Sequence, residues 1–152
     1  MSENLEIISS LYLPVSNTKL LLPNVSVAEV VDFQEPEKNS NETPDYYLGT
    51  VKWRGISVPV LSYELANGAS KVRRSKQARI AVINNIGEHT GKMPFFALMT
   101  QGIPRLVKIS EDLIKASRKK TGPADAALVR VDGEDAVIPD VNYLESLVFP
   151  YA

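Results

Sequence analysis

Short apolar segments separated by turn residues recur along the whole chain. Glycine, proline, asparagine and aspartate bound these segments at short intervals, which is typical of a β-barrel or β-sandwich and not of alternating strands and helices. The protein is therefore predicted to be mainly β. The strands are expected at Glu6–Val15, Thr18–Leu22, Leu48–Trp53, Ile56–Leu61, Arg79–Ile83, Phe95–Met99, Arg105–Ile109, Ala127–Val131 and Ala136–Ile138.

Several predicted strands end on proline or run through it, as in LYLP, LLLP, VPV and VIP. Proline lacks the N–H that a sheet ladder needs, so it suits strand ends, edges and sharp bends. Such bends favour two compact barrels. Gly55 and Gly133 lie at equivalent points of two candidate hairpins, one in each half of the chain. Residues 1–152 are expected to form a single domain, because no linker is long enough to separate two.

Helical signals are few and short. Asparagine, serine and aspartate are good residues for the N-terminal cap of a helix. We predict three short helical segments: Val25–Glu29 capped by Asn24, Glu111–Ala116 capped by Ser110, and Val141–Leu147 capped by Asp140, with Leu144 and Leu147 facing inward. Three polar stretches are expected to be surface loops: Gln34–Asp45, Asn84–Lys92 and Ser117–Asp125.

The stretch YYLGTVKWRGISVPVLSYE, residues 46–64, reads as a hairpin with Trp53, Arg54 and Gly55 at its tip. Side chains alternate between the two faces of a strand, so Trp53 should share the apolar face and Arg54 should point to solvent. Gly55 can adopt the positive φ that a tight turn requires. An exposed arginine on a rigid turn is a frequent interface residue, although most such arginines are simply solvated.

Composition and charge exclude several functions. The 152 residues include no cysteine and one histidine, so a zinc or iron site built from the usual nitrogen and sulfur ligands is not expected. A net charge of −1 gives no positive field for nucleic acid or anionic lipid. The acidic N-terminus does not resemble a signal peptide, and no apolar run approaches the roughly 18 residues of a membrane span. A cytoplasmic location is predicted.

Catalytic groups are not indicated. His89 lies in a polar loop and is expected to be solvated, and no nucleophile can be assigned to it. The residues from Lys71 to Arg79 include five cations but no aromatic residue for base stacking. A solvated loop, a protein contact and an oligonucleotide contact all remain open for this run. The alternatives for the whole protein are a small barrel that binds an oligonucleotide or a small ligand, and an enzyme with a site around His89.

The hairpin sequence also carries a family resemblance. Leu48-Gly49, Trp53-Arg54-Gly55 and Val58-Pro59-Val60 resemble the LxG...LRGxxVPV signature of the CheW-like domain, the adaptor fold of bacterial chemosensory arrays. The segments Val27–Val31, Ala97–Leu106 and Val137–Leu144 resemble further parts of that domain, so the resemblance covers nearly the whole chain. TQGIPRLV together with AVIPD is most similar to the ChpC-type CheW-like proteins of type IV pilus chemosensory systems.

The resemblance implies a CheW-like fold of two packed five-stranded SH3-like β-barrel subdomains with short helices. It also implies a non-enzymatic adaptor without cofactors, which couples the cytoplasmic tip of a chemoreceptor (a methyl-accepting protein) to the regulatory domain of a CheA-type histidine kinase. Neither nucleic acid nor direct membrane insertion is expected. By resemblance, the receptor-binding groove includes Val27, Glu29 and Arg54, and the candidates for the kinase interface are Gly49, Gly102, Ile103 and Arg105.

Four positions depart from the family pattern. Lys52 and Trp53 replace the usual asparagine and leucine, Ser62 replaces an aspartate, and Gln101 replaces the aspartate of a valine-aspartate pair. These departures concern the hairpin tip and the segments that follow the predicted strands. They predict that the partner of this protein differs from that of a standard chemotaxis CheW.

Overall fold

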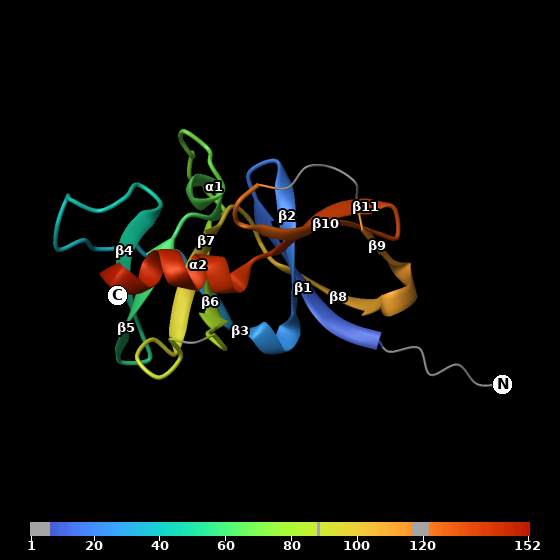
Figure 1. The fold of residues 1–152 in the computed structure, drawn as a ribbon, viewed down its shortest axis with the longest axis horizontal. Coiled ribbons are helices and arrows are strands. Elements are labelled where there is room, and N and C mark those ends of the chain that lie inside the picture. Colours follow the sequence, from blue (N-terminus) through green and yellow to red (C-terminus); the bar gives the residue numbers. More distant parts are fainter. Residues whose placement is uncertain (1–6, 88, 117–121) are drawn as a thin grey trace.

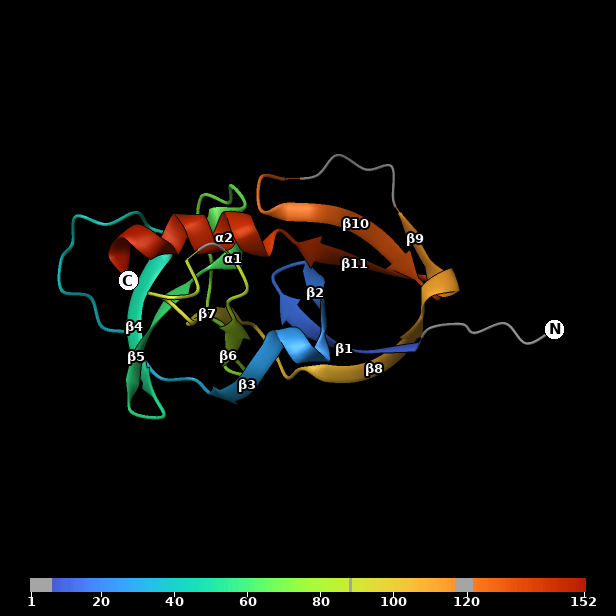
Figure 2. The same cartoon turned by 60° about the horizontal axis from the view of Figure 1, so that its bottom comes forward.

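The computed structural model describes residues 7–87, 89–116 and 122–152, and its strands form two sheets that lie side by side (Figures 1 and 2). The start of the first predicted strand, Glu6, and most of the predicted loop Ser117–Asp125 lie outside the described residues. The strands are β1 Ile7–Val15, β2 Thr18–Pro23, β3 Val27–Asp32, β4 Tyr47–Trp53, β5 Ile56–Leu61, β6 Arg79–Asn84, β7 Phe95–Thr100, β8 Arg105–Ser110, β9 Ile114–Ala116, β10 Asp125–Val131 and β11 Glu134–Pro139. The mainly β prediction is confirmed.

The two sheets repeat one arrangement. The six-stranded sheet has the order β8-β1-β2-β11-β10-β9, and the five-stranded sheet has the order β3-β6-β7-β5-β4. In each, a hairpin (β10–β11 or β4–β5) joins the rest of the sheet through a parallel pairing, β11 with β2 and β5 with β7. The pairs β8–β1–β2 and β3–β6–β7 are antiparallel in both. The predicted similarity of the hairpins at Gly55 and Gly133 is therefore confirmed, and β9 is an additional three-residue strand.

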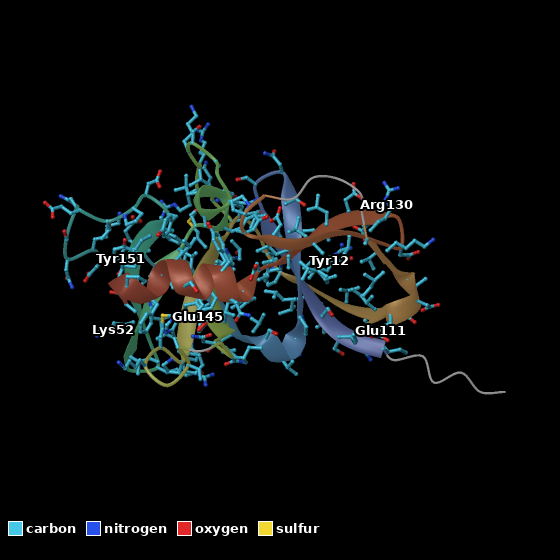
Figure 3. All side chains as sticks on the ribbon, viewed as in Figure 1. Tyr12, Lys52, Glu111, Arg130, Glu145 and Tyr151 are labelled. Atoms are coloured by element: carbon cyan, nitrogen blue, oxygen red, sulfur yellow. The ribbon has the colours of Figure 1, made fainter. Side chains whose placement is uncertain are left out.

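The largest hydrophobic cluster joins the two sheets. Leu13 and Leu20 reach it from the six-stranded sheet, Leu61 and Phe96 from the five-stranded sheet, and Leu144 from the C-terminal helix; all are completely buried. Burying one such side chain stabilises a fold by roughly 1.5–3 kcal/mol. Each sheet also has a smaller hydrophobic cluster of its own. The cluster of the five-stranded sheet lies around Trp53, and that of the six-stranded sheet lies around Tyr12, which is labelled in Figure 3.

Two of the predicted helices are wrong. Asn24–Ser26 forms one 3-10 turn without a side-chain cap, and the chain then enters β3, which pairs with β6. Glu111–Leu113 is likewise a 3-10 turn, followed by β9. In both places, pairing with a neighbouring strand outweighs the local capping signal, because it satisfies the backbone of apolar and β-branched residues.

The C-terminal helix is confirmed. α2 spans Val141–Val148 and lies across the five-stranded sheet in both views (Figures 1 and 2). The Asp140 carboxylate accepts a 3.0 Å hydrogen bond from the Tyr143 N–H, as an N-cap should. Leu144 is buried and Leu147 is half-buried.

The helix α1, Tyr63–Ala66, was not predicted. Its cap is the Ser62 side chain, which accepts from the Leu65 N–H at 3.2 Å. The buried Glu64 carboxylate accepts from the Ser16 N–H at 2.9 Å and from the Gln101 amide at 3.4 Å. Ser16 belongs to the β1–β2 turn of the other sheet, so this carboxylate links the two halves of the molecule. Ser62 and Gln101, two of the departures from the family pattern, thus have structural roles.

Candidate functional site

The tip of the β4–β5 hairpin is a two-residue turn. Trp53 pairs with Ile56, and the residues between them, Arg54 and Gly55, have φ values of 48° and 80°. Two positive φ angles define the turn type whose twist matches the flanking strands. A Cβ on Gly55 would contact nothing within 4 Å, so the backbone conformation alone favours glycine. The predicted positive φ of Gly55 is confirmed, and Arg54 adopts the same region at a cost of about 1 kcal/mol.

The turn orients its side chains as predicted. Trp53 is 7% exposed and shares a cluster with Val51, Val58 and Val60. The Arg54 side chain is 68% exposed. Ile56 lies on the same face as Trp53 but is 40% exposed, because it adjoins the turn at the tip of the hairpin, beyond the cluster.

Glu29 of β3 makes contact with this tip. Its Oε1 accepts two hydrogen bonds, one from Trp53 Nε1 at 2.9 Å and one from Arg54 Nη2 at 3.2 Å. The register of β3 shifts between Val27 and Glu29, which pair with consecutive residues of β6. Such a bulge redirects a side chain, and here the Glu29 carboxylate lies at the end of a different strand pair, 24 positions away in sequence.

The two hydrogen bonds to Glu29 contribute differently to stability. The Arg54–Glu29 pair is solvent-exposed on both sides, and such pairs contribute roughly 0–1 kcal/mol. Trp53 is buried, so its indole N–H would lose hydration without a partner, at a cost of about 1–3 kcal/mol. Arg54 also lies over the indole, 4.8 Å from its centroid, and Phe95 packs against the indole edge-on at 4.9 Å. The three residues Glu29, Trp53 and Arg54 are called the tip cluster below.

Val27 lies two residues before Glu29 and packs against the largest hydrophobic cluster, as does Leu11 of the other sheet. Exposed apolar residues flank both. Leu106, the cross-strand partner of Leu11, is 62% exposed, and Val25 is 83% exposed. The 3-10 turn that carries Val25 lies between β1 and β3 in both views (Figures 1 and 2). Leu11, Val25, Val27 and Leu106 are called the apolar seam.

The four candidates for the kinase interface fall into two groups. Gly49 and Gly102 are buried, whereas Ile103 is 59% exposed and the Arg105 side chain 57% exposed. Gly49 has a φ of 123°, and a Cβ there would lie 2.5 Å from the Glu37 carbonyl oxygen. Glu37 exchanges two backbone hydrogen bonds with Thr50, at 2.9 and 2.8 Å. Gly49 therefore allows the loop after β3 to pair with β4, a role the sequence did not indicate.

In the six-stranded sheet, Arg105 forms an ion pair at the position equivalent to that of the tip cluster in the five-stranded sheet. It lies on β8, the strand equivalent to β3, and donates at 3.0 and 3.3 Å to Glu134, which follows the β10–β11 turn. Its guanidinium lies 4.8 Å from the centroid of Tyr12. The hydrogen bond from Arg105 lowers the pKa of Glu134 below its ordinary value. Relative to the pair of Glu29 and Arg54, acid and base have exchanged places.

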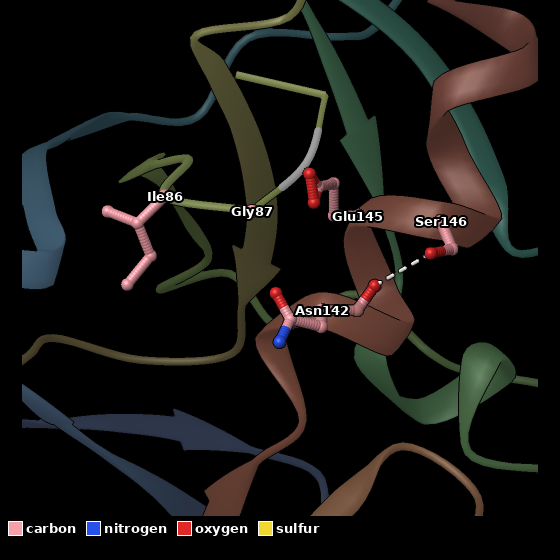
Figure 4. A pocket seen from close by; sticks show the side chains of 5 residues that line it. All are labelled: Ile86, Gly87, Asn142, Glu145 and Ser146. Carbon is pink, nitrogen blue, oxygen red and sulfur yellow. Dashed lines mark hydrogen bonds between the residues drawn. The ribbon is translucent and has the colours of Figure 1, made fainter.

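A cleft of about 570 Å³ lies between α2 and the loop after β6, lined by Ile86, Gly87, Asn142, Glu145 and Ser146 (Figure 4). In the picture the Glu145 carboxylate points toward the loop and Ile86 points away from the helix. Glu145 is 1% exposed, and its Oε1 accepts from the His89 N–H at 3.1 Å. The His89 ring stacks on Phe149 at 3.9 Å. The expectation that His89 is merely solvated is therefore wrong: it is half-buried and packs against the C-terminal segment.

Among residues 7–87, 89–116 and 122–152, no three acidic, histidine or cysteine side chains gather as metal ligands would. The helices in this part of the chain are also too short or too polar to cross a bilayer. The features that stand out are surface features: a rigid charged tip on one sheet, its counterpart of reversed charge on the other, and apolar residues exposed where the sheets meet.

This combination defines a small β protein of two sheets with exposed charged and apolar surface features. The chain matches the model of the CheW-like domain family over residues 10–147, and it belongs to that family. It is also similar to a solved structure, the scaffolding protein TtCheW from Thermoanaerobacter tengcongensis, with 20% identity and a TM-score of 0.76 over 91% of this chain and 92% of that one. No curated protein matches the chain.

The family assignment fixes the class of function. CheW-like proteins are non-enzymatic scaffold or adaptor proteins of chemotaxis signalling. The resemblance seen in the hairpin sequence is thereby confirmed at the level of the family, and the fold agrees with it over most of the chain.

Proposed function

We propose that this protein is a cytoplasmic adaptor that couples the tip of a chemoreceptor to the regulatory domain of a CheA-type histidine kinase. The observation that carries the proposal is the tip cluster, in which Glu29 comes from β3, the strand that also carries Val27 of the apolar seam. An amphipathic receptor helix requires an apolar surface for its apolar face and charges that select its register. Val27 supplies part of the apolar surface, and Arg54 and Glu29 supply the charges.

The tip cluster is suited to this task because it is preorganised. Arg54 is on a two-residue turn, stacked on Trp53 and hydrogen-bonded to Glu29. A partner carboxylate that binds Arg54 encounters a guanidinium already held in place, so little side-chain entropy is lost on binding. Because Glu29 also accepts from Trp53, it keeps a structural bond when a partner draws Arg54 away.

For the kinase interface, we propose that Ile103 and Arg105 make the contact. Both are exposed. Ile103 lies in the connection between β7 and β8, and Arg105 is the first residue of β8. Gly49 and Gly102 act indirectly, because each is buried against other backbone or side-chain atoms. A Cβ on Gly102 would lie 3.2 Å from Pro14, so this glycine sets how closely the connection approaches β1.

We further propose that the protein serves a type IV pilus pathway of the ChpC type. The support is the sequence similarity of TQGIPRLV and AVIPD to those proteins, together with the departures at Lys52, Trp53, Ser62 and Gln101. Trp53 is the departure with the clearest consequence, since leucine has no donor for Glu29.

Isothermal titration with a cognate receptor-tip fragment and with the kinase regulatory domain tests the adaptor function. Both fragments should bind with micromolar affinity. Absence of binding to either would refute the proposal.

Arg54→Glu should weaken receptor binding by at least about tenfold, or 1.4 kcal/mol, while the thermal melt changes little. Arg130→Glu is the matched control, because Arg130 is an equally exposed ion-paired arginine on the other sheet, 62% exposed and 3.1 Å from Asp135. Equal losses of affinity in the two variants would show that only net charge matters. An unfolded Arg54→Glu protein would show that Arg54 is structural.

A further inference from the structure

The five cations between Lys71 and Arg79 form part of an ordered surface. The segment runs from α1 to β6 without regular secondary structure. Its backbone is nevertheless held, since the Ser75 N–H donates to Gln101 Oε1 at 2.7 Å and the Ala78 N–H donates to the Ser75 carbonyl at 3.2 Å. Residues 71–79 are called the basic segment.

An apolar pocket of about 250 Å³ lies against this segment. Its apolar lining comes from three parts of the five-stranded half and from the basic segment itself: Phe33, Pro36, Leu48, Val72 and Met99. Glu35 and Arg74 complete it. Pockets that enclose a whole small-molecule ligand usually measure roughly 300–1,000 Å³. The pocket is therefore better matched to a single apolar side chain than to a cofactor.

The charges around the pocket are only partly compensated. Arg74 pairs with Glu35 at 3.1 Å and lies 4.2 Å from the Phe33 centroid, and Arg79 lies 3.8 Å from Asp32. Lys71, Arg73 and Lys76 are exposed, and none of them forms an ion pair with another residue in the described ranges. The pocket thus has an apolar interior and an excess of positive charge along one side.

We propose that this surface binds an acidic segment of a partner protein, with one apolar side chain in the pocket and flanking carboxylates on Lys71, Arg73 and Lys76. Nucleic acid fits less well, because Arg74 already covers Phe33, the aromatic residue on which a base would stack. A membrane surface also fits less well, since the apolar residues line a recess and Glu35 lies at its rim. An acidic peptide with one apolar side chain can fill the recess and pair with the cations at the same time.

The lining of this pocket includes none of the residues proposed above for the receptor and kinase contacts, and its test changes none of them. A phage-displayed library of random dodecapeptides is selected on the full-length protein, and a selected peptide is then titrated while ¹H–¹⁵N spectra are recorded. We expect selected sequences with one large apolar residue between aspartates or glutamates. The amide signals of Val72 and Met99 should shift on binding.

Two variants distinguish the contributions. The double variant Arg73→Glu/Lys76→Glu should lower the affinity for the selected peptide by at least about tenfold. Val72→Ser should lower the same affinity by several fold. Lys115→Glu/Arg130→Glu makes the same change in net charge on exposed residues of the other sheet and should leave binding unchanged. Thermal melts confirm that each variant is folded.

Three results would overturn the proposal: no acidic and apolar consensus in the selection, equal weakening by the control variant, or spectral shifts confined to residues outside the pocket. Tighter binding of the oligonucleotide dT12, or of vesicles of phosphatidylcholine and phosphatidylserine at 3:1, with the same dependence on Arg73 and Lys76, would replace the peptide with that ligand. Receptor and kinase binding stay intact in these variants if the two surfaces are independent, so failure here leaves the adaptor function to be judged by its own titrations.

Discussion

Trp53 and Glu29 are joined by a hydrogen bond of 2.9 Å from the indole Nε1 to the carboxylate Oε1. The bond connects the tip of the β4–β5 hairpin to β3, at the far edge of the same sheet. The same oxygen accepts from Arg54, so one carboxylate serves a buried donor and an exposed cation. Trp53, one of the four departures from the family pattern, is thus bonded to a residue that the resemblance assigns to the receptor groove.

Replacing Trp53 with phenylalanine tests the structural part of this bond. The variant keeps an aromatic ring against Phe95 but removes the indole donor and part of the buried area. We expect a loss of about 1–3 kcal/mol in the free energy of unfolding, measured by urea denaturation.

Glu29→Gln is the matched control for that variant. Its amide oxygen can still accept from Trp53, while the charge opposite Arg54 is lost. The free energy of unfolding should fall by less than about 1 kcal/mol, as for an exposed ion pair. If Glu29→Gln proves as damaging as Trp53→Phe, the ion pair contributes more than the indole bond and the weights assigned above are wrong.

Gly49→Ala should destabilise the fold even if Gly49 never touches a partner. The positive φ alone costs about 1–2 kcal/mol for a residue with a side chain, and the Cβ would meet the Glu37 carbonyl at 2.5 Å. Gly55→Ala provides the comparison, because it has the strain of φ 80° but open space around its Cβ. Thermal melts of the two variants should show the larger loss for Gly49→Ala. Equal losses would mean that the loop after β3 moves aside freely.

Local patterns were enough to predict the hairpin. Alternation indicated the burial of Trp53 and the exposure of Arg54, and the turn sequence indicated the positive φ of Gly55. The same local reasoning failed at Val25–Glu29, where Asn24 suggested a helix cap. Only a 3-10 turn forms at Asn24–Ser26, and the chain then continues as β3 because β6, more than fifty residues later, supplies hydrogen-bond partners for its backbone. Pairing over such a separation leaves little trace in a single sequence.

The site shows the same limit. Resemblance indicated Glu29 and Arg54, and the structure places their side chains within hydrogen-bonding distance. Neither periodicity nor resemblance predicted that Trp53 would bond Glu29, because the contact depends on a bulge in β3 that redirects one side chain. The role of Gly49 was also missed, since it depends on the path of a loop whose polar sequence sets no particular route.

Tyr63 should make the stability of the protein depend on pH in the alkaline range. Its hydroxyl donates to Asp125, and burial, together with this bond, raises its pKa well above the ordinary value. Below pH 10 the hydroxyl is protonated in both the folded and unfolded states, so the full stabilisation is present. Above roughly pH 10 the unfolded tyrosine ionises first, and the stabilisation is lost as pH rises.

Tyr63→Phe is therefore expected to cost about 1–2 kcal/mol at pH 7, because Asp125 retains its bonds from Asn67 and the Gly122 N–H. The difference from the wild type should stay constant up to about pH 9 and shrink above pH 10. Urea denaturation at pH 7, 9 and 10.5 measures it. A difference that grows with pH would contradict the assigned direction of the pKa shift.

Gly87 and Glu145 should behave as one unit. A Cβ on Gly87 would overlap Glu145 Oε2, and the buried carboxylate is held by the His89 N–H. Gly87→Ala must therefore displace that carboxylate, and we expect a loss of about 1–3 kcal/mol, comparable to the disruption of a buried hydrogen bond to a charged group.

A double-mutant cycle separates this steric effect from an intrinsic need for glycine. Glu145→Ala removes the carboxylate and leaves room for the new Cβ, at its own cost of about 1–3 kcal/mol for the lost acceptor. In that background Gly87→Ala should cost less than about 0.5 kcal/mol, so the coupling energy measured by urea denaturation should be at least about 0.5 kcal/mol. Additive losses would show instead that the loop needs glycine for its own backbone, and that the carboxylate adapts to the Cβ without strain.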